Sequence, residues 1–333
     1  MPPLVGPARV ASAAFIGFCA GSTLGVVGWG GGQIIIPALT SPIMGLSQIA
    51  ATGTSLTSLS FAATVGAGQF LLHDAAHVAT AICIAFPSML AARFGARLAG
   101  KLNSEVHALI FNGMSLVMIP THFIVQHHRN NQKPISDTAK SLGDNSQSSA
   151  AVSFGTPNAS VPNDKTGSAL PSFKSFTLPP PEMMLSHACF GSICGVLSAV
   201  MGVGGLPFTI SYLTLAVPQL PHHLVQGTAM VSVLPSVLTS AFIQAKAGHT
   251  PLSLAAAVCC GSIVGSAAGA KFALSLDENQ LRYAFMASLV LLGGRSFIAA
   301  GFNVRRILQA RRAAAASTHT TLPPLGDARK LGN

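Results

Sequence analysis

Two long stretches of this chain carry no charged side chain, and this feature restricts the fold more than any other. No Asp, Glu, Lys or Arg occurs from Val10 to His73 or from Met183 to Ala245, and each stretch is longer than 60 residues. A soluble domain carries about 25% charged residues, whereas this chain carries 8%. Because a membrane-crossing helix needs about 20 apolar residues, each stretch is long enough for two or three crossings. The sequence therefore predicts an all-α polytopic membrane protein.

The net charge of +10 does not indicate a nucleic-acid partner. Nucleic-acid-binding chains gather their basic residues in one patch or stripe. Here the basic residues lie at the ends of apolar segments and in a C-terminal tail that contains Arg305, Arg306, Arg311 and Arg312. Positive charge beside apolar segments is the usual signal that orients a membrane protein. We expect a lipid bilayer as the environment, in a plasma or organelle membrane, and no nucleic acid.

The two halves of the chain resemble each other at an offset of 174 residues. They align at this offset without a gap for about 100 residues, with roughly one position in six identical. Glycines coincide most often: Gly17 with Gly191, Gly21 with Gly195, and Gly28, Gly30 and Gly31 with Gly202, Gly204 and Gly205. Self-similarity at a fixed offset is typical of a duplicated structure. We expect two homologous membrane repeats.

Each repeat is predicted to contain four full-length helices and one short helix that follows a glycine turn. Repeat 1 spans 11–126, with helices over 11–28, 33–41, 47–71, 76–100 and 104–126. Repeat 2 spans 185–302, with helices over 185–202, 206–217, 221–245, 250–274 and 279–302. Between the repeats, 127–184 is rich in Ser, Asn and Pro and is predicted to be a disordered linker. Residues 303–333 form a basic tail.

The charge pattern favours an inverted arrangement of the two repeats. Positive charge follows one helix in the first half, at Arg93, Arg97 and Lys101, and moves to the preceding loop in the second half, at Lys246. That shift is what inversion across the membrane requires. Inversion also needs an odd number of crossings per repeat, so the short helices must cross with their neighbours. In the alternative, the short helices are re-entrant and the repeats are parallel.

Four motifs carry a resemblance to a known family. The stretches "GVVGWGGGQIIIPAL" and "ATGTS" in the first half and "MGVGGLPF" and "QGTAM" in the second resemble the TauE/SafE family of sulfite-exporter-like permeases. That family has two repeats, each with a G-x-G-G turn in its first hairpin. The resemblance covers 11–126 and 185–302 and implies transport of sulfite, sulfonates or related small sulfur-containing anions. The second half departs from the pattern, because Leu206 and Pro207 replace Gly32 and Gln33.

The glycine turns are the first candidates for the substrate site. A helix start leaves N–H groups without internal partners and carries a partial positive charge, so it attracts anions. Glycine leaves those N–H groups uncovered. The candidate residues are Gly28, Gly30, Gly31, Gly32 and Gln33 in the first half and Gly202, Gly204 and Gly205 in the second. The alternative is that these glycines only allow close packing between helices.

Hydroxyl and cationic side chains add further candidates. Thr54, Ser55 and Thr228 are expected within helices, where they either donate to an oxyanion or bond back to their own helix. Arg97 and its counterpart Lys271 either attract the anion or extend to the membrane interface and set the topology.

The residues lining the predicted spans exclude most enzymatic chemistry. No Asp or Glu lies deep in a predicted span, and neither a metal-ligand motif nor a nucleophile paired with a base is present. We therefore expect no cofactor, no metal and no catalytic residues. The leading hypothesis is a secondary transporter of small anions, either alone or as a homo-oligomer. The alternatives are a membrane scaffold or channel-like protein without sulfur specificity and, less favoured, a membrane-embedded enzyme.

Overall fold

The computed structural model describes residues 6–29, 31–103, 105–111 and 179–288 except 219, together with 113, 120, 290–291 and 294. Within these residues every regular element is a helix and no strand occurs. The helices are α1 (Pro7–Val27), α2 (Gly32–Leu39), α3 (Gln48–Leu72), α4 (Val78–Ala99), α7 (Pro181–Met201), α8 (Leu206–Ala216), α9 (His222–Lys246) and α10 (Leu252–Ser275). Residues 105–111 and 278–288 are also helical. The all-α prediction is confirmed for this part of the chain.

The predicted bounds of these eight helices lie within four residues of the observed ones. The two largest differences are at the starts of α1 and α7, which begin at Pro7 and Pro181 rather than at the predicted 11 and 185. Proline is favoured at a helix start because its missing N–H would have no partner there. Both helices thus extend one turn past their apolar segment. Most of the predicted linker and the whole tail lie outside the described residues.

The helices of the second half begin at positions offset by 174 from those of the first. Pro7–Val27 becomes Pro181–Met201, and Gln48–Leu72 becomes His222–Lys246, with both bounds shifted by 174 in each pair. The short helices likewise begin at Gly32 and Leu206. The helix starts therefore have one spacing in both halves, although α8 has 11 residues and α2 has 8.

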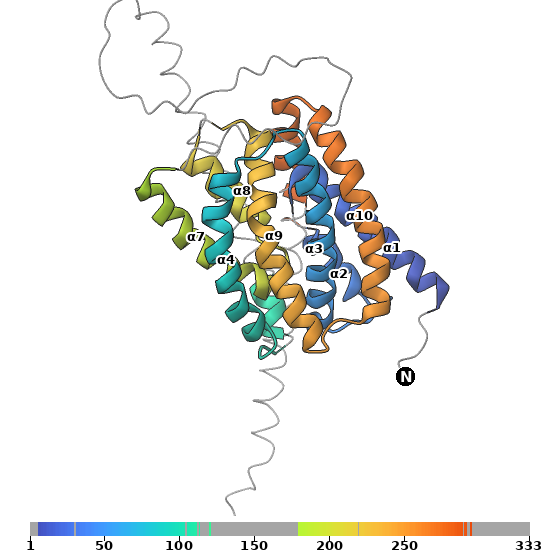
Figure 1. Cartoon of the computed structure of the whole chain (residues 1–333). Coiled ribbons are helices and arrows are strands. Elements are labelled where there is room, and N and C mark those ends of the chain that lie inside the picture. Colours follow the sequence, from blue (N-terminus) through green and yellow to red (C-terminus); the bar gives the residue numbers. More distant parts are fainter. Residues whose placement is uncertain are drawn as a thin grey trace, which may run out of the picture.

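The two central helices run in opposite directions. Gly53, near the start of α3, lies against Thr250, just after the end of α9. Gly227, near the start of α9, lies against Ala75, just after the end of α3. The central helices α3 and α9 are therefore antiparallel, and they lie between the pair α4–α7 and the pair α1–α10 (Figure 1).

The first helix of each half packs closely against a helix of the other half. A Cβ atom built on Gly17 or Gly21 of α1 would lie 2.1 or 2.2 Å from a backbone oxygen of α10, that of Val258 or Ser262. The second contact is equivalent, because Gly191 and Gly195 of α7 would meet the Ile84 and Ser88 oxygens of α4 at 2.4 and 2.2 Å. Small residues at these positions let the helix backbones touch. Each pair also runs parallel, since contacts advance together along both helices.

The outer surface of the helices is apolar, as a bilayer requires. Six of the described helices are long and apolar enough to cross a membrane: α1, α3, α4, α7, α9 and α10. Large hydrophobic side chains are exposed along them, including Phe15, Phe86, Phe94 and Phe242. An apolar exterior of this extent is stable in lipid rather than in water. The chain is a multi-pass integral membrane protein.

Basic and acidic side chains concentrate at opposite ends of the bundle. We call the end where α1, α3 and α10 begin the first face, and the opposite end, where α4, α7 and α9 begin, the second face. Among the described residues, the first face carries five basic side chains and one acidic one, namely Arg9, Arg93, Arg97, Lys101, Lys246 and Glu105. The second face carries four acidic and two basic side chains, namely Asp74, Glu182, Asp277, Glu278, Lys271 and Arg282.

Candidate functional site at the two glycine turns

Two helices end in the same way, at a glycine in the left-handed region. Gly28 ends α1 with φ +68°, and its N–H donates to the Leu24 carbonyl. Gly202 ends α7 with φ +74°, and its N–H donates to the Ser198 carbonyl. A left-handed residue at this position reverses the chain and is usually glycine. Both helices are thus broken at the positions that the sequence predicts.

After each turn the chain passes back into the interior and starts a short helix. A Cβ built on Gly32, the first residue of α2, would lie 2.4 Å from the Gly202 carbonyl oxygen and 2.8 Å from the Val203 Cα. The start of α2 therefore touches the turn that ends α7. Gly31, the N-cap of α2, packs against Ala20 of α1. Glycine segments far apart in the sequence thus meet in the interior of the bundle.

The two turns differ in backbone conformation and in the donors they offer. In the second half, Gly202, Gly204 and Gly205 all have positive φ, whereas Gly31 is right-handed with φ −52°; Gly30 lies outside the described residues. The second residue of α8 is Pro207, which has no N–H. The corresponding residue of α2 is Gln33, whose backbone keeps its N–H and whose side chain is buried. The start of α2 therefore has one backbone N–H more than the start of α8.

The three predicted hydroxyl residues have different partners. Ser55 donates from Oγ to the Gly202 carbonyl at 2.7 Å, so it bridges α3 to the second turn. Thr54 donates to the Ala50 carbonyl of its own helix at 2.8 Å, which is the alternative role considered for it. Thr228 accepts from the His77 N–H at 2.8 Å and so fastens the loop before α4. All three are buried, and Ser55 is the one that contacts a glycine turn.

The two predicted cations lie away from one another. Arg97 is exposed in the last turn of α4 at the first face. Lys271 is exposed near the end of α10 at the second face. Exposed cations at helix ends are placed to reach the headgroup region, so their positions favour the topological role over a shared anion site.

Two side chains that sequence reasoning missed hold the ends of the broken helices. Gln226 of α9 donates from Nε2 to the carbonyls of Gly25 and Val26 at 3.0 and 3.3 Å. His107 donates from Nε2 to the carbonyl of Val200, which is the counterpart of Val26 at the offset of 174. The last carbonyls of a helix lack internal partners, and here a buried side chain from another helix satisfies them. Gln226 opens the motif QGTAM, whereas no sequence pattern marks His107 for this role.

One comparison with known proteins gives a match over most of the chain. The family model described as "Sulfite exporter TauE/SafE" matches residues 13–296, a range that contains both glycine turns and all the described spans from α3 to α10. Neither the curated proteins nor the solved structures provide a match. A match over most of the chain confirms the resemblance found in the motifs. The chain therefore belongs to the TauE/SafE sulfite exporter family, a family of membrane transporters.

Proposed function

We propose that this protein is a secondary transporter that moves small sulfur-containing anions, such as sulfite or an organosulfonate, along a path between its two halves. The observation that carries the proposal is the contact of Gly32 with the Gly202 turn in the bundle interior. Irregular backbone at membrane depth is tolerated where it is buried in protein or lines a cavity. Broken helices that meet at a repeat interface are the usual substrate site of secondary transporters.

The halves are best explained as inverted repeats. Their helices share one spacing, and α3 runs antiparallel to its counterpart α9. The segment 28–39 returns the chain to the face where α1 began, so the short helix crosses with its neighbours as inversion requires. A two-fold axis in the membrane plane relates such repeats, and alternating access follows when one unit rocks against the other. The glycine-packed pairs α1–α10 and α4–α7 are suited to be those rigid units.

The start of α2 supplies the chemistry for an anion. The N–H groups of its first turn and the helix dipole favour negative charge. Ser55 Oγ lies 2.9 Å from the position a Gly32 Cβ would take, and its hydroxyl, which donates to the Gly202 carbonyl in this arrangement, becomes available to an anion beside these N–H groups when that bond breaks. Because Gly32 and Gly202 touch in this structure, we propose that it represents a closed state and that the substrate enters when the two turns separate.

We expect the first face to be cytoplasmic. Basic residues concentrate on the cytoplasmic side of membrane proteins, and the first face carries most of the described ones. Single cysteines at Lys101 and Asp74, both exposed on opposite faces, test this in a background without native cysteines. A membrane-impermeant maleimide added to intact cells should label Asp74→Cys. It should label Lys101→Cys only after the cells are permeabilised. The reverse pattern would show that the orientation is wrong.

Transport in proteoliposomes tests the proposed function. Sulfite, sulfate, thiosulfate and taurine are offered separately, and flux is compared with protein-free vesicles. In the described spans no Asp or Glu lies beyond the first helical turn, so we propose that the membrane potential drives a net anion movement. Saturable flux of a sulfur-containing anion supports the proposal, and absence of flux with all four would contradict it.

A further inference from the structure

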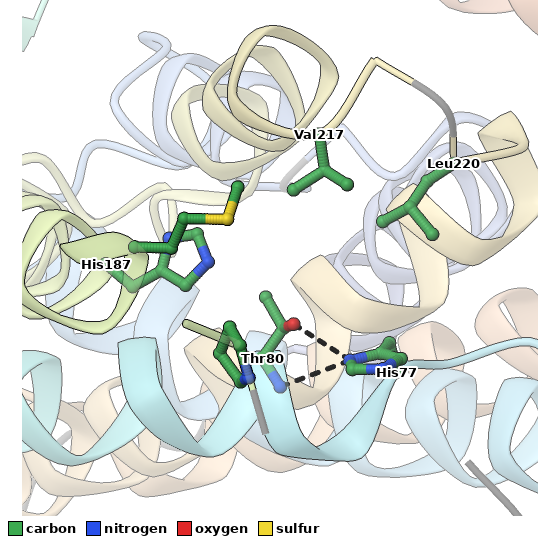
Figure 2. Close-up of a pocket in the computed structure, with 7 residues that line it drawn as sticks. His77, Thr80, His187, Val217 and Leu220 are labelled. Carbon is green, nitrogen blue, oxygen red and sulfur yellow. Dashed lines mark hydrogen bonds between the residues drawn. The ribbon is translucent and has the colours of Figure 1, made fainter. Parts of the chain in front are cut away.

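A small pocket opens at the second face, away from the glycine turns. It is lined by His77, Thr80, Pro179, Met183, His187, Val217 and Leu220 (Figure 2). These residues come from the starts of α4 and α7 and from the connection between α8 and α9. Its enclosed part has room for about one water-sized group, and the pocket is partly open to the outside, so it suits the head of a small ligand whose remainder lies at the mouth.

His187 points an unsatisfied polar atom into this pocket. The residue is 1% exposed, and its Nδ1 pairs with the Tyr212 hydroxyl at 2.7 Å. Its buried Nε2 has no hydrogen-bond partner among the described residues, and the free edge of the ring faces the interior of the pocket (Figure 2). Because a buried polar atom without a partner costs free energy, a ligand that bonds to it gains binding energy.

The hydrogen bonds around both histidines are suited to an acceptor on the ligand. His77 Nδ1 accepts from the Thr80 N–H at 3.3 Å and from the Thr80 hydroxyl at 2.8 Å, so in the neutral ring Nε2 carries the proton. Burial lowers the pKa of His77, which favours that neutral ring. When Tyr212 donates to His187 Nδ1, the His187 Nε2 likewise carries a proton and donates.

The helix dipoles at this place favour an anion. The α4 helix begins next to His77, and α7 and α9 begin two residues after Pro179 and Leu220. The starts of three helices therefore surround the pocket, against one helix end, that of α8 at Val217. Each helix start carries about half a positive charge. Glu182 is exposed on the first turn of α7 and opposes an anion, but it does not line the pocket.

The remaining wall is apolar, and this selects an organic anion. Pro179, Met183, Val217 and Leu220 add hydrocarbon and thioether surface to the lining beside the two imidazoles. A bare inorganic oxyanion would leave that surface without contacts, whereas a short alkyl chain would cover it. The two histidines have no equivalents in the other half, because the counterparts of His187 and His77 at the offset of 174 are Ala13 and Pro251.

We propose that this pocket is a binding site for small organic anions, with a sulfonate or carboxylate head on His187 and His77 and a short apolar chain on Met183, Val217 and Leu220. This proposal rests on the proposed function, because it takes such an anion to be a substrate of the transporter. The pocket then holds the substrate at the second face, apart from the glycine turns.

Equilibrium binding to the full-length protein in lipid nanodiscs tests the site, with ethanesulfonate as the probe and calorimetry as the measurement. His187→Leu should weaken binding at least tenfold, because it removes one donor. Met183→Trp fills the pocket, keeps both histidines, and should weaken binding as much. His73→Ala, at an exposed histidine of the same face, should bind like the wild type. Ethyl methyl sulfone, a neutral molecule of similar shape, should bind at least tenfold more weakly than ethanesulfonate.

The results separate this site from the transport proposal. The site is wrong if the wild type does not bind ethanesulfonate, if Met183→Trp binds it within twofold of the wild type, or if the neutral sulfone binds as well. Met183→Trp decides the matter if His187→Leu does not fold. Flux of sulfite with no effect of these variants on binding would overturn the site and leave the transporter intact. Binding that the variants abolish, in a protein that moves no anion, would overturn the transporter and leave the site intact.

Discussion

Replacing Gly202 with leucine is expected to abolish anion flux while a folded protein is still produced. Gly202 has φ +74°, a conformation that costs other residues about 1–2 kcal/mol. A Cβ there would also lie 2.7 Å from Thr52 Cγ2 and 3.0 Å from Ile36 Cδ1. The substitution therefore displaces the turn that accepts the hydrogen bond of Ser55 and that contacts the first residue of α2. The initial rate of sulfite uptake in proteoliposomes measures the effect, which should exceed a hundredfold.

Gly45 provides the matched control for this substitution. It has φ +64°, and nothing lies within 4 Å of the position of its Cβ. Gly45→Leu thus introduces the same kind of backbone strain in an exposed loop without a clash. We expect its flux to stay within about twofold of the wild type. Wild-type flux in Gly202→Leu would mean that the second turn is not part of the substrate path.

Replacing Gly261 with leucine is expected to prevent the bundle from assembling. A Cβ on Gly261 of α10 would lie 1.9 Å from the Ala14 carbonyl oxygen and 2.8 Å from the Phe18 nitrogen of α1. Both neighbours are backbone atoms, so the clash is relieved by separating the two helices. Overpacking costs about 1–3 kcal/mol where side chains can move, and more is expected here. Native proteins have only about 5–15 kcal/mol of stability.

The yield of monodisperse protein after detergent extraction measures this second effect. Gly68→Leu is the control, because Gly68 lies within α3 and nothing is within 4 Å of its Cβ position. We expect the Gly68 variant to elute like the wild type and the Gly261 variant to aggregate or to be degraded. A normal elution profile for Gly261→Leu would show that α1 and α10 do not pack through their backbones.

The order and bounds of the helices could be predicted from the sequence because they depend on local patterns. Charge-free stretches define the spans, and the recurrence of glycines at an offset of 174 marks the same breaks in both halves. The glycine clusters that begin at Gly28 and Gly202 predict the helix breaks, and the structure shows that each break is a left-handed helix end.

The partners of each helix could not be predicted, because they depend on contacts between distant segments. Nothing in the glycine pattern indicates that α1 packs on α10 rather than on α3, or that Gly32 touches Gly202. For the same reason Ser55 and Thr54, adjacent and similar in sequence, have different partners. His187, near the start of α7, is buried beside Tyr212 of α8, and this contact between distant residues has no local signal. The anion-binding role of the glycine turns stays a prediction.

The measurement that tests the transporter most directly is sulfite flux through the purified wild-type protein under an imposed membrane potential. Proteoliposomes are loaded with sulfite, and efflux is followed with the interior held negative, at zero potential and positive. We predict saturable efflux that is fastest with a negative interior and that Gly202→Leu abolishes. Efflux equal to that of protein-free vesicles at every potential would contradict the proposed function, and protein-dependent efflux that ignores the potential would contradict the proposed driving force.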